Sequence, residues 1–394
     1  MLDKTLAKTD HAAAGIPDQV TPSRERRIAT RRLRIALFAP HFAEYATRLA
    51  TALAEEASVV LFLDKYNCAE ECDPALLQEA RRKLWIVEFD SRGRAPRNRS
   101  RVRVLSWIWA FRPHVVHVQE QPDTLTTSIV RVIGPRRKMV LTVHDPEPHS
   151  GNDHAYATRM APQRRLLRDR ANAYHVHGAY CRELLLATEW NTKPVVSTAH
   201  GVILVPRPGD RTQPEPGRIM LFGRMEAYKG IDVLAEAARI LRTKGVSFRL
   251  VLAGRGPELE RFQGAANAHE DVEIIARFLA PQEAIRQFQR ASIIVAPYRD
   301  ATQSGVVAAA FGNGRPVVAS RVGGLVDTIT HGVNGLLIPP NDPVALAAAL
   351  EQILTSDDLQ RRLLDGARAA AATALDWSRI SATLLHAYAE LRAS

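Results

Sequence analysis

The 394-residue sequence contains no long hydrophobic run and few aromatic residues, which make up 6% of the chain. A helix that crosses a bilayer needs about 18 or more consecutive apolar residues, so the sequence predicts no membrane-spanning segment. Residues 1–30 mix charged residues with alanine and proline and have no apolar segment. This composition argues against a cleaved secretory signal and predicts a disordered lead-in of a cytoplasmic protein.

Cysteine is also scarce, with Cys68, Cys72 and Cys181 as the only three. Three cysteines are too few for a disulfide framework. No further cysteine or histidine pair near Cys68 and Cys72 completes a set of four zinc ligands, and no cluster of carboxylates suits magnesium or manganese. We therefore expect reduced thiols in a loop, no metal site and no cofactor.

Acidic residues are outnumbered, and the net charge is +11 with an isoelectric point near 9.9. Such an excess is typical of proteins that bind nucleic acids, anionic membranes or anionic substrates. No zinc finger, RNA-binding consensus or alternating aromatic and basic strand accompanies the arginine clusters at 24–34 and 92–103, so we expect no nucleic-acid partner. Solvated surface is the simplest interpretation of these clusters. The preferred functional interpretation is that they contact an anionic membrane surface, the inner face of the plasma membrane.

One arginine-rich segment has helical spacing. Val102, Leu105 and Trp109 fall on one face of a helix over residues 99–109. Such a face belongs to a protein core more often than to a membrane-binding surface. The spacing therefore predicts that these three side chains are buried.

Strand-like apolar runs alternate with helix-length segments throughout the chain, which is the pattern of parallel sheets covered by helices on both faces. In the first half, strands are expected at residues 33–39, 58–63, 85–89, 114–118, 138–143, 173–176 and 194–198. In the second half they are expected at 218–222, 247–253, 272–275, 292–296, 316–320 and 336–338.

Residues 205–217 contain four prolines and two glycines, a density that disfavours regular structure and indicates a linker. The chain is also too long for one ordinary core. We expect an α/β protein with two doubly wound, Rossmann-like domains that face a cleft. Its parts are a lead-in over 1–30, an N-terminal domain over 31–204, the linker, a C-terminal domain over 218–375, and a final helix over 376–394 that returns to the N-terminal domain.

Two segments of the second half predict an anion site. A strand from residue 218 ends in a glycine turn with Arg224 and Lys229 five residues apart, and a second strand at 292–296 leads through Thr-Gln-Ser-Gly into a helix of small residues. A helix start offers free backbone N–H groups and a positive dipole to a phosphate. Two cations at such a position oppose the dipole, so an anion accounts for them better than solvent alone.

The motifs of the second half resemble those of the retaining glycosyltransferases of family four, which have the GT-B fold. The resemblance rests on residues 223–230, 253–258, 314–320, 323–324 and 332–339 and covers most of 218–343. It implies transfer of a hexose, with retention of configuration, from a nucleoside diphosphate sugar to a glycan or lipid-linked acceptor. Polysaccharide or cell-envelope biosynthesis is the implied setting.

The same resemblance implies site residues. Arg224 and Lys229 would grip the donor diphosphate, and Gly223 would allow its close approach. The other implied donor contacts are Gly254, Arg255, Phe278, Thr302, Gln303, Ser304, Gly305 and Val306.

In the first half, residues 140–145 resemble the strand-end Thr-Val-His-Asp element of the family. This places His144 at the reacting centre and Asp145 and His149 on the acceptor side. The first strand lacks the family's Gly-Gly loop and continues instead through His41 and Tyr45. Both are candidate acceptor contacts, with packing of the first helix as an equal alternative.

The sequence also departs from the family. The two glutamates that the family carries, separated by seven residues, fall on Ala301 and Ala309, and Asp327 stands where a glutamate is usual. These changes leave altered specificity and lost activity both open. The alternatives are a non-catalytic sugar-nucleotide-binding protein and a GT-B nucleotide-sugar epimerase.

Overall fold

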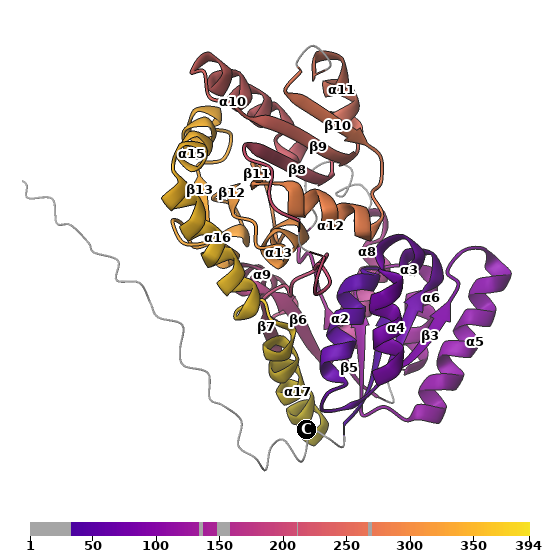
Figure 1. Ribbon diagram of the computed structural model, residues 1–394. Coiled ribbons are helices and arrows are strands. Elements are labelled where there is room, and N and C mark those ends of the chain that lie inside the picture. The colour runs from indigo at the N-terminus through magenta and orange to yellow at the C-terminus, as the bar shows by residue number, and fades with distance from the viewer. Residues whose placement is uncertain (1–32, 134–136, 148–157, 211, 267–269) are drawn as a thin grey trace, which may run out of the picture.

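The computed structural model describes residues 33–133, 137–147, 158–210, 212–266 and 270–394 (Figure 1). Two parallel β-sheets form the centres of two domains. The seven-stranded N-terminal sheet has the order β3 (Trp85–Phe89), β2 (Ser58–Asp64), β1 (Arg34–Ala39), β4 (Val115–Gln119), β5 (Lys138–Thr142), β6 (Ala173–His177), β7 (Val195–Thr198). The six-stranded C-terminal sheet has the order β10 (Val272–Ala276), β9 (Arg249–Arg255), β8 (Arg218–Arg224), β11 (Ile293–Ala296), β12 (Val317–Ser320), β13 (Gly335–Ile338).

The strand order reverses at one place in each sheet, between β1 and β4 and between β8 and β11. Loops that leave the carboxyl ends of such neighbouring strands go to opposite faces of the sheet and open a crevice. Central strands such as β1 and β11 are buried along nearly their whole length. Their β-branched and aliphatic residues pack against helices on both faces, as a covered parallel sheet requires.

Two layers of helices cover the N-terminal sheet. One face is covered by α2 (Ala43–Leu53), α3 (Lys65–Glu71) and α4 (Pro74–Lys83). The other face is covered by α5 (Arg94–Phe111), α6 (Thr124–Ile133), α8 (Ala161–Arg170) and α9 (Gly178–Leu186).

The C-terminal domain encloses one continuous apolar core around its sheet. Its helices are α10 (Ile231–Thr243), α11 (Pro257–Ala266), α12 (Pro281–Arg290), α13 (Gly305–Gly312), α14 (Leu325–Thr328), α15 (Pro343–Thr355) and α16 (Asp357–Ala372), with a 3₁₀ turn, η1 (Ala227–Lys229), before α10.

The last helix, α17 (Trp377–Ala393), leaves the C-terminal domain and packs on the N-terminal one (Figure 1). Its Ile380, Leu384 and Tyr388 lie in the same apolar cluster as α2. The Tyr388 hydroxyl also hydrogen-bonds His117 of β4. The N-terminal core therefore contains side chains from both ends of the described chain.

All thirteen predicted strands occur within two residues of their expected bounds, and the described residues of 205–217 contain no helix or strand. Four helices, α3, α8, α9 and α14, were not predicted. The first begins because the Asp64 carboxylate accepts hydrogen bonds from the backbone N–H groups of Tyr66 and Asn67. Cys68 and Cys72 are consequently buried along and at the end of this helix, so their predicted place in a loop is wrong.

The predicted burial of Val102 and Trp109 is wrong as well, whereas Leu105 is partly buried and packs against the apolar core. Helix α5 buries the stripe that contains Ser100, Val104 and Ile108. The Ser100 hydroxyl accepts a hydrogen bond from the Asp90 N–H and donates one to the Asp90 carbonyl, which fixes this stripe against the sheet. A helix presents only one such stripe to its sheet, so Val102 is left 61% exposed and Trp109 55% exposed.

Candidate functional site

A cavity of about 280 Å³ lies between the domains, at the carboxyl ends of β8 and β11. Its position matches the crevice that the strand order predicts. The N-terminal domain and the connecting segment contribute Phe42, Asp145, Ile203 and Leu204. The C-terminal domain contributes Phe222, Gly223, Arg224, Tyr228, Lys229, Tyr298, Ala301, Gln303, Ser304, Gly305, Val306 and Ala309.

Lys229 is the buried cation of this cavity. It ends η1 and is 5% exposed, and its ammonium donates a hydrogen bond of 2.6 Å to the Tyr298 hydroxyl. The same ammonium lies 4.0 Å from the centre of the Tyr298 ring. Burial, with a smaller contribution from Arg224, lowers the pKa of Lys229 to about 7. The group is therefore half-charged near neutral pH and would gain its full charge beside an anion.

Glycines give the backbone its path around Lys229. Gly223, near the end of β8, has φ of 111°, and Gly230, directly after Lys229, has φ of 69°. A Cβ at residue 230 would lie 2.1 Å from the Pro297 carbonyl oxygen. The turn between η1 and α10 and the Pro297–Tyr298 segment can therefore approach each other only because residue 230 has no side chain.

A second positive group stands at the end of β8. The parallel register pairs Gly223 with Gly254 and Arg224 with Arg255, so the two arginines lie side by side at the edge of the cavity. The Arg255 guanidinium lies 5.7 Å from the ring of the exposed Phe278. Gly254, Arg255 and Phe278 are outside the residues that line the cavity and form a shelf next to Arg224.

The N-terminus of α13 faces the same cavity. The Ser304 side chain caps this helix by accepting a hydrogen bond of 3.3 Å from the Val307 N–H. Gly305 and Val306 follow as the first residues of the helix, and both line the cavity. An anion at this position would meet a positive helix end as well as Lys229 and Arg224.

Contacts from the N-terminal domain hold the turn before α13. The Thr302 hydroxyl donates a hydrogen bond to the Asp145 carboxylate, and the Cys181 thiol donates one of 3.2 Å to the Thr302 carbonyl. Thr302 is buried and lies outside the residues that line the cavity. Asp145 lines it, as the sole carboxylate among the lining residues.

Gln303 is the lining residue with an unsatisfied polar atom. Its Oε1 is buried and has no hydrogen-bond partner among the described atoms. Such an atom costs about 1–3 kcal/mol unless a ligand or water satisfies it. Ala301 and Ala309 are also buried at the cavity wall, where their methyl groups provide no polar contact.

His144 lies behind the cavity wall. Its Nε2 donates a hydrogen bond of 2.6 Å to Gln119 Oε1, and its ring lies 4.3 Å from that of Phe42, which lines the cavity. Burial lowers the pKa of His144 to about 3, so the imidazole is neutral. Phe42 separates His144 from the cavity, and the role of His144 at a reacting centre stays a prediction.

The other predicted acceptor contacts are not brought together. Tyr45 is buried in the N-terminal core, where its ring lies 5.1 Å from that of Trp377 and of His200, so the structure supports its packing alternative. His41 is exposed and does not line the cavity. His149 lies outside the described residues.

Several residues of the site were not predicted from the sequence. Phe42, Tyr228 and Tyr298 line the cavity, and Tyr298 holds the Lys229 ammonium. Tyr298 lies four residues before the polar Thr302–Gly305 turn, from which the sequence predicts the anion site. Phe42 gave no local signal, because its left-handed backbone at φ of 59° follows from the tertiary structure.

One carboxylate near the site joins the two domains, and a second holds the segment that leads from the N-terminal domain to the C-terminal one. Asp327 Oδ2 of α14 accepts a hydrogen bond of 2.8 Å from the Tyr180 N–H, in the first turn of α9. Glu44 of α2 accepts one of 2.7 Å from the Leu204 N–H. These pairs are 147 and 160 residues apart in the sequence, so no local pattern predicts them.

No group of three or more histidine, cysteine or acidic side chains in the described residues is arranged to hold a metal ion. Among the same residues, no helix is long and apolar enough to cross a bilayer.

Comparison with known proteins adds to this geometry. Residues 216–356 match the family described as "Glycosyl transferases group 1". The chain is 33% identical over 182 residues to a D-inositol 3-phosphate glycosyltransferase of Corynebacterium urealyticum, an alignment that covers 44% of this chain and 43% of the relative. The chain thus aligns with less than half the length of this curated relative.

Solved structures match over nearly the whole chain. A sucrose-phosphate synthase from Thermosynechococcus elongatus superimposes with a TM-score of 0.69 at 19% identity, covering 92% of this chain and 100% of that one. Anabaena Alr3699/HepE in complex with UDP and glucose superimposes with a TM-score of 0.64 at 16% identity, covering 91% and 100%. The two parallel-sheet domains share the arrangement of these glycosyltransferase structures, and the fold is GT-B.

Proposed function

From the GT-B fold and a C-terminal domain that matches the group 1 glycosyl transferases, we propose that this protein transfers a hexose from a nucleoside diphosphate sugar. The acceptor is a glycan or a lipid-linked sugar, and the anomeric configuration is retained. One observation carries the proposal. The buried Lys229, the neighbouring Arg224 and the N-terminus of α13 converge on one interdomain cavity.

In this proposal the donor diphosphate occupies the cavity between Lys229, Arg224 and the first N–H groups of α13. Negative charge grows on the diphosphate as the bond to the sugar breaks, and these groups stabilise it more in the transition state than in the ground state. The leaving diphosphate would also raise the pKa of Lys229 from about 7, because an adjacent anion favours the ammonium form. The shelf of Arg255 and Phe278 would receive the base end of the nucleotide.

The sugar would then lie between Asp145 of the N-terminal domain, which lines the cavity, and Gln303, whose unsatisfied Oε1 would accept a hydrogen bond from a sugar hydroxyl. For retention, the acceptor hydroxyl attacks the anomeric carbon from the side that the diphosphate leaves. The bond to the diphosphate oxygen breaks as the new glycosidic bond forms, and the hydroxyl proton passes to the departing phosphate oxygen. His144 would contribute only after Phe42 turns away from it, so we place it behind Arg224 and Lys229 in importance.

The proposal is tested with purified protein and a panel of nucleoside diphosphate sugars. We expect one donor to raise the melting temperature and to be hydrolysed slowly without acceptor. Arg224→Ala or Lys229→Ala should weaken donor use by about 2 kcal/mol or more, the scale of a lost charge-assisted contact. Lys244→Ala removes a surface ammonium that pairs with Glu351 and serves as the control, with unchanged donor use.

Other outcomes separate the alternatives. Donor binding without hydrolysis or transfer to any glycan acceptor favours a non-catalytic sugar-nucleotide-binding protein. Conversion of the donor to its epimer favours an epimerase. Unchanged kinetics in both the Arg224→Ala and Lys229→Ala variants would contradict the placement of the diphosphate.

A further inference from the structure

Helix α5 carries an unusual combination of exposed groups on the side of the N-terminal domain that faces away from the C-terminal domain (Figure 1). Arg94, Arg97, Arg99, Arg101 and Arg103 all belong to it. No acidic residue occurs anywhere between residues 91 and 119. None of the five arginines forms a salt bridge within the part of the chain that the structure describes.

Apolar side chains lie among these arginines. Val102 and Trp109 point outward from α5, at 61% and 55% exposed, and Trp107 is 36% exposed. Trp85 of β3, the edge strand, is 54% exposed and packs edge-on against Phe111 in the last turn of α5, with ring centres 5.8 Å apart. We call the exposed side chains of α5 together with Trp85 the α5 face.

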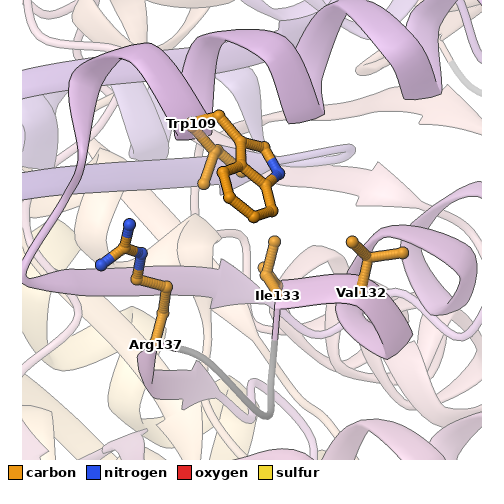
Figure 2. A pocket seen from close by; sticks show the side chains of 5 residues that line it. Trp109, Val132, Ile133 and Arg137 are labelled. Atoms are coloured by element: carbon orange, nitrogen blue, oxygen red, sulfur yellow. The ribbon is translucent and has the colours of Figure 1, made fainter.

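A shallow apolar hollow continues the α5 face. Figure 2 shows the Trp109 ring reaching from α5 toward Ile133 and Val132 at the end of α6, with Arg137 beside them. The hollow is therefore apolar at its base and has a cation at its rim. A tryptophan in this setting has an apolar ring and a polar N–H, the combination that is enriched at membrane interfaces.

We propose that the α5 face binds the surface of an anionic lipid bilayer. Arginines contact lipid phosphate groups at an anionic surface, while tryptophan and valine enter the boundary between headgroups and acyl chains. The net charge of residues 1–32 argues against this segment of the chain as the occupant of the α5 face. Residues 1–32 carry seven basic and four acidic residues, so this segment would meet repulsion on a surface whose charged side chains are all arginines.

The test is co-sedimentation with vesicles. The full chain should bind vesicles of phosphatidylcholine with one third phosphatidylglycerol and bind pure phosphatidylcholine at least tenfold more weakly. High salt should release it, because it screens the attraction between the arginines and the lipid phosphates. Arg99→Glu with Arg103→Glu should weaken binding to the anionic vesicles by about tenfold or more, since both contacts become repulsive. Trp109→Ser should weaken it by about fivefold or more through the lost apolar ring.

Arg361→Glu with Arg362→Glu on α16 makes the same change in net charge on the other domain and should leave vesicle binding unchanged. Binding of a nucleoside diphosphate should be equal in all variants, which separates this proposal from the proposed function. The proposal is overturned if the unmodified chain ignores anionic vesicles. It is equally overturned if the α16 variant loses as much binding as the α5 variant, or if the Trp109→Ser and arginine variants both bind normally.

Discussion

Lys229 is the residue whose surroundings control the charge of the interdomain cavity. Its ammonium is buried against Tyr298, and burial lowers its pKa to about 7. An exposed lysine keeps its charge far above neutral pH, whereas this one loses it in the range in which the protein would work. The affinity for an anion therefore depends on pH through this single group.

This dependence is a measurable prediction. Above pH 7, Lys229 is mostly neutral in the free site. Binding of a diphosphate is therefore coupled to the uptake of a proton by Lys229. The affinity for the nucleoside diphosphate of the proposed function should fall by up to about tenfold per pH unit between about pH 7 and 9. Calorimetry at pH 8 in buffers of different ionisation enthalpy should show uptake of about one proton. Lys229→Met should abolish the uptake, and uptake that persists in this variant would assign the proton to another group.

At the scale of single elements, the turn between η1 and α10 depends on Gly230. Alanine at this position would have a strained left-handed backbone, and its Cβ would lie 2.1 Å from the Pro297 carbonyl oxygen. Gly245 has nearly the same backbone, with φ of 71°, and no neighbouring atom within 4 Å of an added Cβ. The two glycines therefore separate backbone strain from close packing.

We expect Gly245→Ala to lower the free energy of unfolding by about 1 kcal/mol, the cost of the strained backbone alone. Gly230→Ala should lower it by about 3 kcal/mol and also weaken nucleotide binding, because Pro297 and Tyr298 must move. Urea unfolding and a thermal shift with UDP measure the two effects. Equal losses of stability in the two variants would show that the contact with Pro297 adds nothing to the destabilisation.

The elements themselves were the most predictable part of the molecule. Buried parallel strands such as β4 and β11 are continuous apolar runs, so the sequence located them within two residues. The face of α5 was mispredicted because Ser100, a polar residue, occupies the buried stripe through its bonds to Asp90. The spacing of apolar residues along the sequence does not reveal a hydrogen bond to a neighbouring loop.

The candidate site divides in the same way. Gly223, Arg224 and Lys229 belong to one short segment, and their place at the cavity could be predicted from a strand followed by a glycine turn. The opposite wall of the cavity could not be predicted from the sequence, because Phe42 lines the cavity through a left-handed backbone that depends on the tertiary structure. Tyr45 lies three residues further on and turns into the core.

For the whole molecule, the Asp327 contact with α9 joins the two domains. Asp327→Ala should leave the first turn of α9 uncapped and lower the free energy of unfolding by about 1 kcal/mol. It should also broaden the distribution of interdomain distances measured by fluorescence transfer between labels on the two domains. Asp342→Ala removes an N-cap of similar geometry within α15, at 2.8 Å from the Ala345 N–H, and should affect stability alone. Identical distance distributions in both variants would refute the coupling.

Buried histidines determine the response of the whole fold to acid. Burial lowers the pKa of each of five: His117, His144, His175, His177 and His200. The unfolded chain therefore binds more protons than the native one below about pH 6.5, and stability is lost as the pH falls toward the native pKa values of about 3 to 4.

Each of these groups should lower the free energy of unfolding by up to about 1.4 kcal/mol per pH unit. Urea unfolding at pH 6.5 and pH 5 should show a loss of several kcal/mol, in a range where most carboxylates stay ionised. A difference below about 1 kcal/mol would mean that the histidines accept protons in the native state.

The path of α17 has a consequence for how the protein is made. The ribosome delivers β1 to β7 first, yet the apolar face of that sheet is completed by Leu384 and Tyr388, which emerge only after the whole C-terminal domain has been made. The nascent N-terminal domain must therefore keep part of its apolar surface uncovered until α17 has been translated. Chaperone dependence during synthesis should therefore reflect the wait for α17.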